Sequence, residues 1–351
     1  MPAIAPPSKV LVTGANGFIA VWLVNNLLER GYTVRGTVRS EAKAQYLRER
    51  FSSYGDKHEV VVVEDVTKDG AFDEAVKDID GILHTASPCH VDADDPNEVI
   101  VPAVRGTISI MESALKYGPS VKRIIVTSSC ATINKMDSTS VTYTEADWAE
   151  QTIQAVKEKG RDAGGMIKYR ASKTLAEKAA WEFYETHKGA VAWELAVINP
   201  PWVFGPSIHD VSTPENLNSS TLTWYKNIIQ LASEGATNDL LAVTGACYVD
   251  VRDLVEAHAL ALEKAAAGGE RFIVSAGISA WQDFIDAGNK LDPPPRLSLP
   301  LRKSLRNTGI TNPAPVYFFD SSKATRILGI KFRSLAETTK DTLADYEERG
   351  W

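Results

Sequence analysis

The segment TGANGFIA at residues 13–20 constrains the fold of this chain more than any other. It follows a short apolar run and opens a stretch, residues 18–30, whose apolar side chains recur at helical spacing. Gly14 allows a sharp turn, Gly17 allows a pyrophosphate to approach the backbone, and Ala20 lets the helix lie close to the strand. The free N–H groups at the helix start attract phosphate. A strand, a glycine turn and a helix in this order predict a dinucleotide-binding unit, with a tight turn without ligand as the alternative.

Apolar strand-like runs alternate with helix-like segments through the first part of the chain. Strands are expected at residues 9–13, 32–38, 59–63, 81–84, 122–127 and 191–198, and helices at 18–30, 41–51, 96–117 and 166–187. This alternation predicts an α/β fold with a doubly wound parallel sheet of the Rossmann type. Residues 135–165 are polar and irregular and are expected to form a surface excursion.

The alternation of strand-like and helix-like segments ends after Asn199, where several prolines predict loops. Shorter helices are expected at residues 222–233, 252–266, 280–291 and 321–328. We therefore expect a dinucleotide-binding domain at residues 1–200, with parts of 240–275 able to pack back onto it. Residues 201–351 are expected to form mainly a smaller, less regular substrate-binding lobe.

The composition argues against several classes of protein. Lys and Arg number 38 against 45 Asp and Glu, a net charge of −7, and no basic run suits nucleic acid or an anionic membrane. No apolar run approaches the roughly 18 residues of a membrane-spanning helix. Cys89, Cys130 and Cys247 lack zinc-ligand spacing, so no metal is expected. The first residues lack the features of a signal peptide, and we expect a cytoplasmic protein, monomeric or homodimeric.

The end of the second expected strand indicates which dinucleotide is bound. NAD-binding proteins place an acidic residue there for the ribose 2′-hydroxyl. This strand instead ends in Gly-Thr-Val-Arg-Ser, and Arg39 stands where a 2′-phosphate would lie. Lys43, one helical turn later, can add a second positive charge. The pattern favours NADPH over NADH, with a solvated surface arginine as the alternative interpretation.

Other strand ends should line the same groove. The carboxylate of Asp65 can accept from the adenine amino group, and the small residues of the Thr-Ala-Ser segment leave room for the cofactor. The further residues expected to contact the cofactor are Asn16, Phe18, Ile19, Val66, Thr85, Ala86, Ser87 and Thr127.

A tyrosine, a lysine and a serine form the expected reacting centre. Tyr169 and Lys173 are four residues apart in YRASK and therefore share one face of a helix. A lysine ammonium favours the phenolate of a nearby tyrosine and makes the phenol a usable proton donor. The hydroxyl of Ser129, after the fifth strand, can stabilise negative charge on a carbonyl oxygen. Tyr-x-x-x-Lys alone is common as a solvated pair, but with the serine and the glycine turn it predicts carbonyl–alcohol interconversion.

These motifs resemble the extended short-chain dehydrogenase/reductases over essentially the whole chain. TGANGFIA, GTVRS, HTASP, VKRIIVTSS, YRASK and NPPWVFGP look like the dihydroflavonol-reductase-like branch, and closest to its yeast-type NADPH-dependent carbonyl (aldehyde, ketone and methylglyoxal) reductases. The resemblance implies a catalytic set of Ser129, Tyr169 and Lys173, with Ser129 preferred to Ser128. Tyr169 and Lys173 would also contact the cofactor, and Lys173 would hold the nicotinamide ribose.

The resemblance also implies residues around the nicotinamide and the substrate. The turn from Pro200 to Val203 would meet the nicotinamide carboxamide, and Asn134 matches a substrate-contacting asparagine of flavonoid reductases. Ser219 or Ser220 is a looser match to a phosphate contact. The segment YVDVRD at residues 248–253 is interpreted as structural. Candidates for the substrate pocket are His90, Trp202, Phe204 and Trp224, with core packing as the alternative for Trp202 and a solvated loop position for His90.

The expected function is reduction of an aldehyde or ketone to an alcohol with NADPH. One alternative is an NDP-sugar epimerase or dehydratase of the same superfamily, which would normally hold NAD permanently. Another is a protein that binds NADPH without catalysing a reaction. The physiological substrate and the chirality of the product alcohol are not specified by these motifs.

Overall fold

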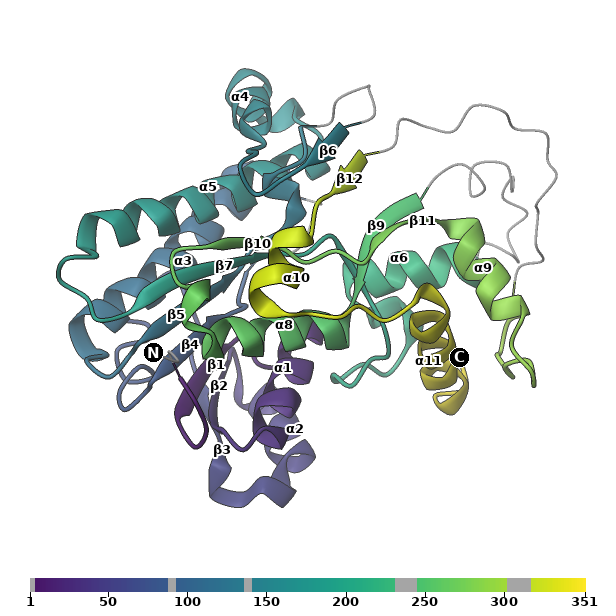
Figure 1. Ribbon diagram of the computed structural model, residues 1–351, viewed down its shortest axis with the longest axis horizontal. Helices are drawn as coiled ribbons and strands as arrows, with labels where there is room; N and C mark the ends of the chain where they lie inside the picture. Colours follow the sequence, from purple (N-terminus) through teal and green to yellow (C-terminus); the bar gives the residue numbers. More distant parts are fainter. Residues whose placement is uncertain (1–3, 88–92, 136–140, 231–244, 302–316) are drawn as a thin grey trace.

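A seven-stranded parallel sheet forms the centre of the molecule, as the computed structural model shows (Figure 1). The structure describes residues 4–87, 93–135, 141–230, 245–301 and 317–351. The strands run in the order β10-β7-β5-β4-β1-β2-β3, and each neighbouring pair is parallel. Their bounds are β1 (Lys9–Thr13), β2 (Thr33–Val38), β3 (His58–Val62), β4 (Gly81–His84), β5 (Arg123–Thr127), β7 (Glu194–Asn199) and β10 (Arg271–Ile273). The expected doubly wound α/β fold is confirmed.

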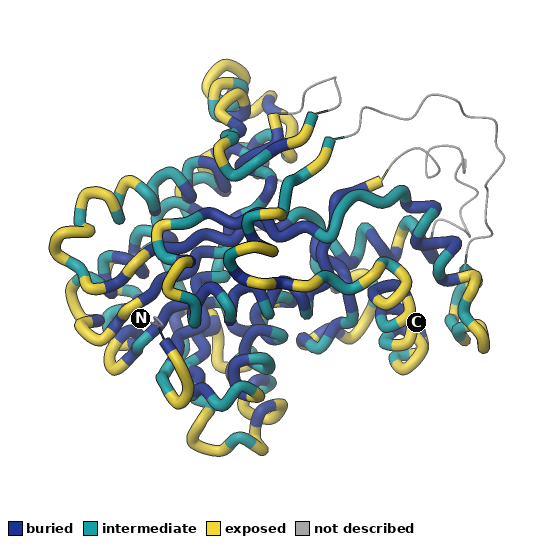
Figure 2. The backbone as a smooth tube through the Cα atoms, in the orientation of Figure 1, coloured by how far each residue is buried: buried dark blue, intermediate teal, exposed yellow. Residues whose placement is uncertain are grey.

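Helices cover both faces of this sheet. The bounds are α1 (Phe18–Glu29), α2 (Glu41–Arg50) and α8 (Val251–Glu263) for one face, and α3 (Asn97–Tyr117) and α5 (Gly165–His187) for the other. Alternate side chains of β1 face opposite ways: Val10 and Val12 join the core under α1 and α8, whereas Leu11 joins the core under α3 and α5. Burial is accordingly concentrated in the central strands, and the outer turns of the helices are exposed (Figure 2).

A smaller lobe follows β7 and has its own aromatic core. It contains a three-stranded sheet in the order β11-β9-β8. The bounds are β8 (Trp202–Phe204), β9 (Gly245–Asp250), β11 (Gly277–Ala280), α6 (Ser219–Ile228), α9 (Trp281–Asn289) and α11 (Leu335–Glu348). The ring of Phe204 lies at the centre, with centroids 5.6 Å from Phe284 and 5.9 Å from Trp281.

The excursion at residues 135–165 contains regular structure that was not expected. Within it lie β6 (Val141–Tyr143), which pairs in parallel with β12 (Tyr317–Phe319), and α4 (Glu150–Lys159), which packs against α5. Only Thr152 is buried in α4, so its sequence lacks an apolar stripe that would mark a helix. Short elements complete the chain: α10 (Ser322–Leu328) and the 3₁₀ helices η1 (Ser52–Lys57), η2 (Cys130–Thr132), η3 (Gly160–Asp162), η4 (Pro214–Asn216) and η6 (Ala265–Ala267).

Helix α11 was also not expected, because threonines supply much of its buried face. Thr338, Thr339 and Thr342 are buried there together with Leu343 and Tyr346. The Thr342 hydroxyl donates to the carbonyl of Thr338 at 2.6 Å, which satisfies this polar atom inside the core. Because threonines occupy much of the buried face, the apolar residues of this segment do not show the periodicity that would predict a helix.

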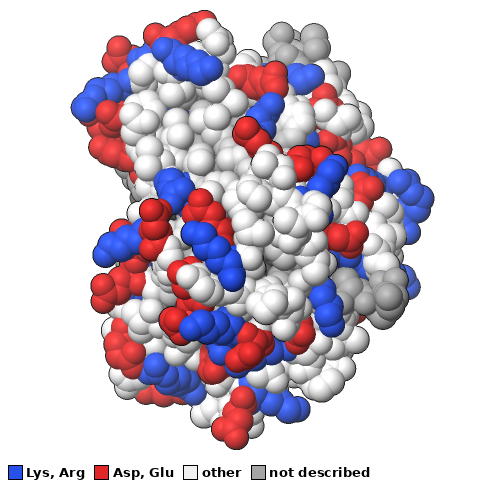
Figure 3. Space-filling model, turned by 90° about the vertical axis from the view of Figure 1, so that its left-hand side faces the viewer, with Lys and Arg blue, Asp and Glu red and all other residues white. Residues whose placement is uncertain are grey.

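The surface carries charges of both signs. On the face shown in Figure 3, basic and acidic side chains are interspersed around uncharged regions. No helix among the described residues is long and apolar enough to cross a membrane. Across that same part of the chain, no three His, Cys, Asp or Glu side chains come together as a metal site.

Candidate active site

The glycine turn between β1 and α1 has the geometry of a phosphate cradle. Gly14 has a φ of 64°, and a Cβ there would lie 3.1 Å from the Cα of Ala86, so this turn fits tightly against the end of β4. Gly17 forms the N-cap of α1, where a Cβ would meet only the Gly14 carbonyl oxygen, at 3.4 Å. The N–H groups of the first helical turn, including those of Phe18 and Ile19, have no intrahelical acceptor. The turn therefore presents free donors to an open space that a side chain at position 17 would fill.

Thr13 locks the turn to the end of β4. Its Oγ1 accepts the N–H groups of Thr85 and Ala86, each at 3.1 Å, and lies 2.9 Å from His84 Nδ1. Because both oxygen lone pairs are used, we assign the hydroxyl proton to Nδ1 and the imidazole proton to Nε2. Burial and the charge of Lys173 lower the pKa of His84 to about 3, so this imidazole is neutral.

The basic residues expected at the 2′-phosphate lie beside β2. Arg39 follows the last residue of this strand and is exposed. Lys43, in the first turn of α2, forms an ion pair with Asp210, with Nζ 3.1 Å from the carboxylate. The neighbouring Asp65 accepts the N–H and hydroxyl of Thr67 on one oxygen, at 2.9 and 2.6 Å. Val66 instead contacts α3, since a Cβ on Gly106 would lie 3.1 Å from its side chain.

Residues 206–210, which we call the strap, cross from the smaller lobe to α1 and α2. The indole of Trp22 donates to the Pro206 carbonyl, and the phenol of Tyr46 donates to the Ile208 carbonyl, both at 2.8 Å. His209 packs edge-on against Phe18, with ring centroids 5.5 Å apart. The strap therefore lies beside the glycine turn, a contact between distant segments that no local sequence pattern indicated.

Helix α5, which carries Tyr169 and Lys173, packs against the turn that follows β5. Lys173 is buried, Tyr169 is half-buried, and α5 packs against η2, whose N-cap is Ser129. The three expected catalytic residues thus come from one helix and one adjoining turn at the carboxyl edge of the sheet.

The two serines after β5 have different surroundings. Ser128 is buried, and its hydroxyl donates to Glu177 at 2.5 Å. The Oγ of half-buried Ser129 accepts the N–H of Ala131 at 3.0 Å, which leaves the hydroxyl proton for another acceptor. This contrast favours Ser129 as the serine that meets a substrate oxygen.

The turn after β7 runs beside the turn after β5. The N–H of Ser128 donates to the Ile198 carbonyl at 2.8 Å, and that of Cys130 donates to the Pro200 carbonyl at 2.9 Å. Ser129 is therefore held next to the Pro200–Pro201 turn, which leads to the buried Val203. The hydroxyl of Thr127 is engaged elsewhere, 2.8 Å from Nε2 of the buried His258.

The expected substrate residues are not all in one place. Asn134 is buried, and its main-chain carbonyl oxygen accepts from Arg170, the neighbour of Tyr169 in sequence, at 3.1 Å. Trp202 is half-buried and stacks on Phe204. Trp224 has no exposed surface and packs against Phe284 in the smaller lobe, so the structure places it in a core instead of on a pocket wall. His90 lies outside the described residues.

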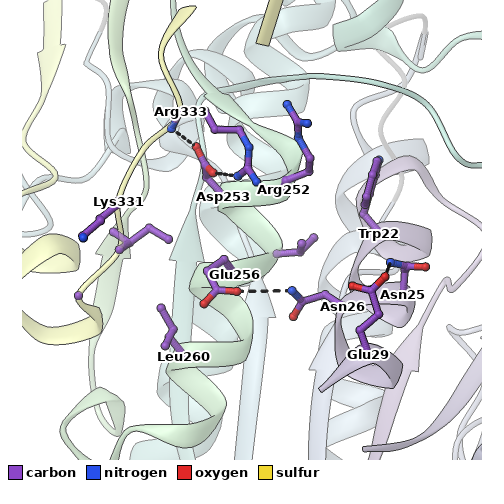
Figure 4. Close-up of a pocket in the computed structure, with 13 residues that line it drawn as sticks. Trp22, Asn25, Asn26, Glu29, Arg252, Asp253, Glu256, Leu260, Lys331 and Arg333 are labelled. Carbon is purple, nitrogen blue, oxygen red and sulfur yellow. Dashed lines mark hydrogen bonds and ion pairs between the residues drawn. The ribbon is translucent and has the colours of Figure 1, made fainter. Parts of the chain in front are cut away.

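A surface groove of about 400 Å³ lies between α1, α8 and residues 329–333 (Figure 4). None of the residues expected at the active site line it. Its charged side chains are largely paired: Arg333 with Asp253, and Arg252 with Asp250 and Asp341. We interpret it as a structural seam between the sheet domain and the C-terminal segment.

Sequence reasoning missed a set of buried polar residues behind the catalytic face. Glu177 continues the four-residue spacing of Tyr169 and Lys173 along α5, a signal that could have been noticed. Asn199 and Arg271, which contact Glu177, are distant in sequence and carry no such signal.

Comparisons with known proteins agree with this geometry. The model of the NAD dependent epimerase/dehydratase family matches residues 10–277. The chain is 37% identical over 343 residues to an NADPH-dependent methylglyoxal reductase, GRE2, of Saccharomyces cerevisiae, covering 95% of this chain and 96% of the relative. It is 36% identical to the ketoreductase azaE of Aspergillus niger, covering 97% and 98%. Among solved structures, yeast methylglyoxal/isovaleraldehyde reductase Gre2 complexed with NADPH superimposes with a TM-score of 0.80 at 34% identity, covering 97% and 98%.

Proposed function

Because this chain belongs to the NAD dependent epimerase/dehydratase family, we propose that it reduces an aldehyde or ketone to an alcohol with NADPH. One observation carries the proposal. Ser129 caps η2, and this short helix packs against the helix that presents Tyr169 and Lys173. The relatives named as methylglyoxal reductase and ketoreductase support the same reaction class.

The residues at the glycine turn fit a dinucleotide. The open space at Gly17 faces the unpaired N–H groups of the first turn of α1, which suit a pyrophosphate. Arg39 and Lys43 would hold the 2′-phosphate, while the segment from Thr85 to Ser87 and the turn from Pro200 to Val203 would border the rest of the cofactor. When bound, NADPH supplies the hydride that reduces the carbonyl carbon.

The chain itself supplies the proton and orients the substrate. Tyr169 donates its phenolic proton to the carbonyl oxygen. The ammonium of Lys173 stabilises the phenolate that remains and would hold the nicotinamide ribose hydroxyls. Ser129 donates a hydrogen bond to the same carbonyl oxygen, whose negative charge grows in the transition state. These assignments are supported by the shared face of α5 and by the acceptor role that Ala131 gives to the Ser129 oxygen.

The family also includes epimerases and dehydratases, and an enzyme of that kind would keep NAD bound from one turnover to the next. The exposed Arg39 at the tip of β2, with Lys43 in the next turn, favours a phosphorylated dinucleotide that exchanges between turnovers.

We further assign the substrate side mainly to residues 201–351, because β8 follows the Pro200–Pro201 turn directly. We place the protein in the cytoplasm as a monomer or homodimer, in keeping with the free thiols of Cys130 and Cys247.

The test is a steady-state assay of the purified protein. Oxidation of NADPH is followed against a panel of aldehydes, ketones, ketoesters and a dihydroflavonol, and repeated with NADH. We expect turnover of at least one carbonyl class and a lower KM for NADPH than for NADH. Tightly bound NAD in the purified protein, with no carbonyl turnover, would instead identify an epimerase or dehydratase. NADPH binding without turnover across the panel would identify a non-catalytic binding protein.

A further inference from the structure

Behind the catalytic face, one buried carboxylate receives hydrogen bonds from several elements of the site. Glu177 is 1% exposed and lies one helical turn beyond Lys173 on α5. Its Oε2 accepts from Ser128 at 2.5 Å and from both Thr132 and Asn199 at 2.8 Å. Its Oε1 accepts from Nε of Arg271 at 2.6 Å. We call Glu177 and these partners (Ser128, Thr132, Asn199 and Arg271) the Glu177 hub.

Three of the hub partners adjoin a part of the site. Ser128 precedes Ser129, and Thr132 ends the short helix that Ser129 caps. Asn199 precedes the Pro200–Pro201 turn, and its amide also donates to the Ser129 carbonyl at 3.3 Å. A single carboxylate therefore connects the helix of Tyr169 and Lys173 to both neighbouring turns.

Arg271 fixes the carboxylate from the opposite side. It is the first residue of β10 and is buried, and it forms an ion pair with Glu177. Its Nη1 donates to the carbonyls of Glu145 and Asp147 at 2.6 and 3.1 Å, and its guanidinium lies 3.7 Å from the centroid of Trp148. With these partners the guanidinium has little freedom, so the Glu177 carboxylate has little freedom either.

The donor pattern requires a carboxylate. Both oxygens of Glu177 act as acceptors, whereas a glutamine amide offers one acceptor oxygen and an NH₂ group that only donates. In either amide orientation, an NH₂ group would face an N–H or O–H donor of Arg271 or of the other partners. The turn that carries Ser129 would then lose part of its attachment to α5.

We propose that Glu177 is a positioning residue that sets the location of Ser129 relative to Tyr169 and Lys173. The inference rests on the proposed carbonyl reduction. Glu177 does not touch the reacting atoms; it acts through the backbone on either side of Ser129. Its effect on the rate should therefore exist only while Ser129 has a hydroxyl to position.

The test is a double-mutant cycle in the full-length enzyme with NADPH and an accepted carbonyl substrate. Glu177→Gln, Ser129→Ala and the double variant are compared for kcat, KM and the NADPH dissociation constant, with melting temperatures recorded. Glu182→Gln is the matched control, because it makes the same change at an exposed position of α5. We expect Glu177→Gln to lower kcat by about tenfold or more, with NADPH affinity changed less than about threefold. In the Ser129→Ala background the same change should alter kcat by less than about twofold.

Ser128→Ala provides a second test if Glu177→Gln does not fold. It removes one hydrogen bond to Glu177 and keeps the ion pair between Glu177 and Arg271, and we expect the same dependence on Ser129 with a smaller loss in kcat. Equal losses in both Ser129 backgrounds, or an unchanged kcat in the Glu177 and Ser128 variants, would overturn the inference while leaving carbonyl reduction intact. A wild-type protein that reduces no carbonyl would refute the proposed function and this inference with it.

Discussion

Lys43 and Asp210 form an ion pair of 3.1 Å between α2 and the strap that crosses from the smaller lobe. Both side chains are close to half exposed, at 44% and 47%. The lysine expected to bind the cofactor phosphate thus already has an anionic partner. Phosphate binding must compete with this carboxylate, or share the ammonium with it.

Replacing Asp210 by Asn should therefore improve cofactor binding. An exposed ion pair is worth about 0.2–1 kcal/mol, so we expect the KM for NADPH to fall by about 1.4-fold to fivefold. The KM for NADH, which lacks the phosphate, should not change. Steady-state kinetics with both cofactors measure this, and an equal fall for NADH would show that Asp210 acts through the strap and not through Lys43.

Arg39→Ala should weaken NADPH binding selectively. A charge-assisted hydrogen bond to phosphate would be lost, and we expect the KM for NADPH to rise by about tenfold or more while that for NADH changes little. Arg50→Ala, at the exposed end of the same α2 region, serves as the control. Similar losses for both cofactors would contradict a contact between Arg39 and the 2′-phosphate.

Tyr169→Phe should remove the proton donor without disturbing the cofactor site. We expect kcat to fall by about a hundredfold or more, and the NADPH dissociation constant to change little. Tyr184→Phe, on the same helix and also half-buried, should keep full activity. Full activity in the Tyr169 variant would refute its role.

The stability of the fold should decrease in mild acid because of buried neutral histidines. Burial lowers the pKa of His258 to about 4, below the ordinary 6.5. Between these values the unfolded chain binds a proton that the folded chain does not, so the free energy of unfolding falls as the pH falls. His258 alone should contribute a loss of roughly 1.5 kcal/mol between pH 6.5 and pH 5. Urea unfolding of His258→Gln should show a correspondingly smaller pH dependence, and an unchanged one would contradict the neutral state.

Tyr346→Phe should not destabilise the protein. The hydroxyl of Tyr346 is buried and has no hydrogen-bond partner among the described residues. Its removal therefore removes the free-energy cost of burying an unpaired polar group. We expect the free energy of unfolding to stay level or rise by up to about 1 kcal/mol. Tyr32→Phe is the contrasting variant, because that hydroxyl donates to Glu263 at 3.2 Å and its loss should destabilise. A clear loss of stability in Tyr346→Phe would contradict this prediction.

The sequence predicts the features that depend on neighbouring residues. The glycine turn can be predicted because Gly14, Gly17 and the start of α1 are close together in the sequence. The alternation of strands and helices can be predicted from the periodicity of the apolar residues. The expected catalytic pair can be predicted because Tyr169 and Lys173 are four residues apart and therefore share a helix face. The roles of these residues in binding and catalysis stay predictions until the variants above are measured.

Features that depend on distant contacts could not be predicted. Arg271 meets Glu177 across 94 positions of sequence, and Asp210 meets Lys43 across 167. Nothing near Trp224 in the sequence distinguishes a tryptophan in the core of the smaller lobe from one that lines a pocket. The threonine-rich face of α11 likewise requires the fold itself to show that the hydroxyls of Thr338 and Thr342 have hydrogen-bond partners inside the core.

The position of β10 at the edge of the large sheet, beside β7, has a consequence for how the enzyme matures on the ribosome. Strand β1 and helix α1, which flank the glycine turn, are synthesised long before Arg271, which completes the Glu177 hub. In a nascent chain, the turn that carries Ser129 therefore lacks this anchor until residue 271 has been synthesised. Catalytic competence should be acquired late in translation, once β10 docks.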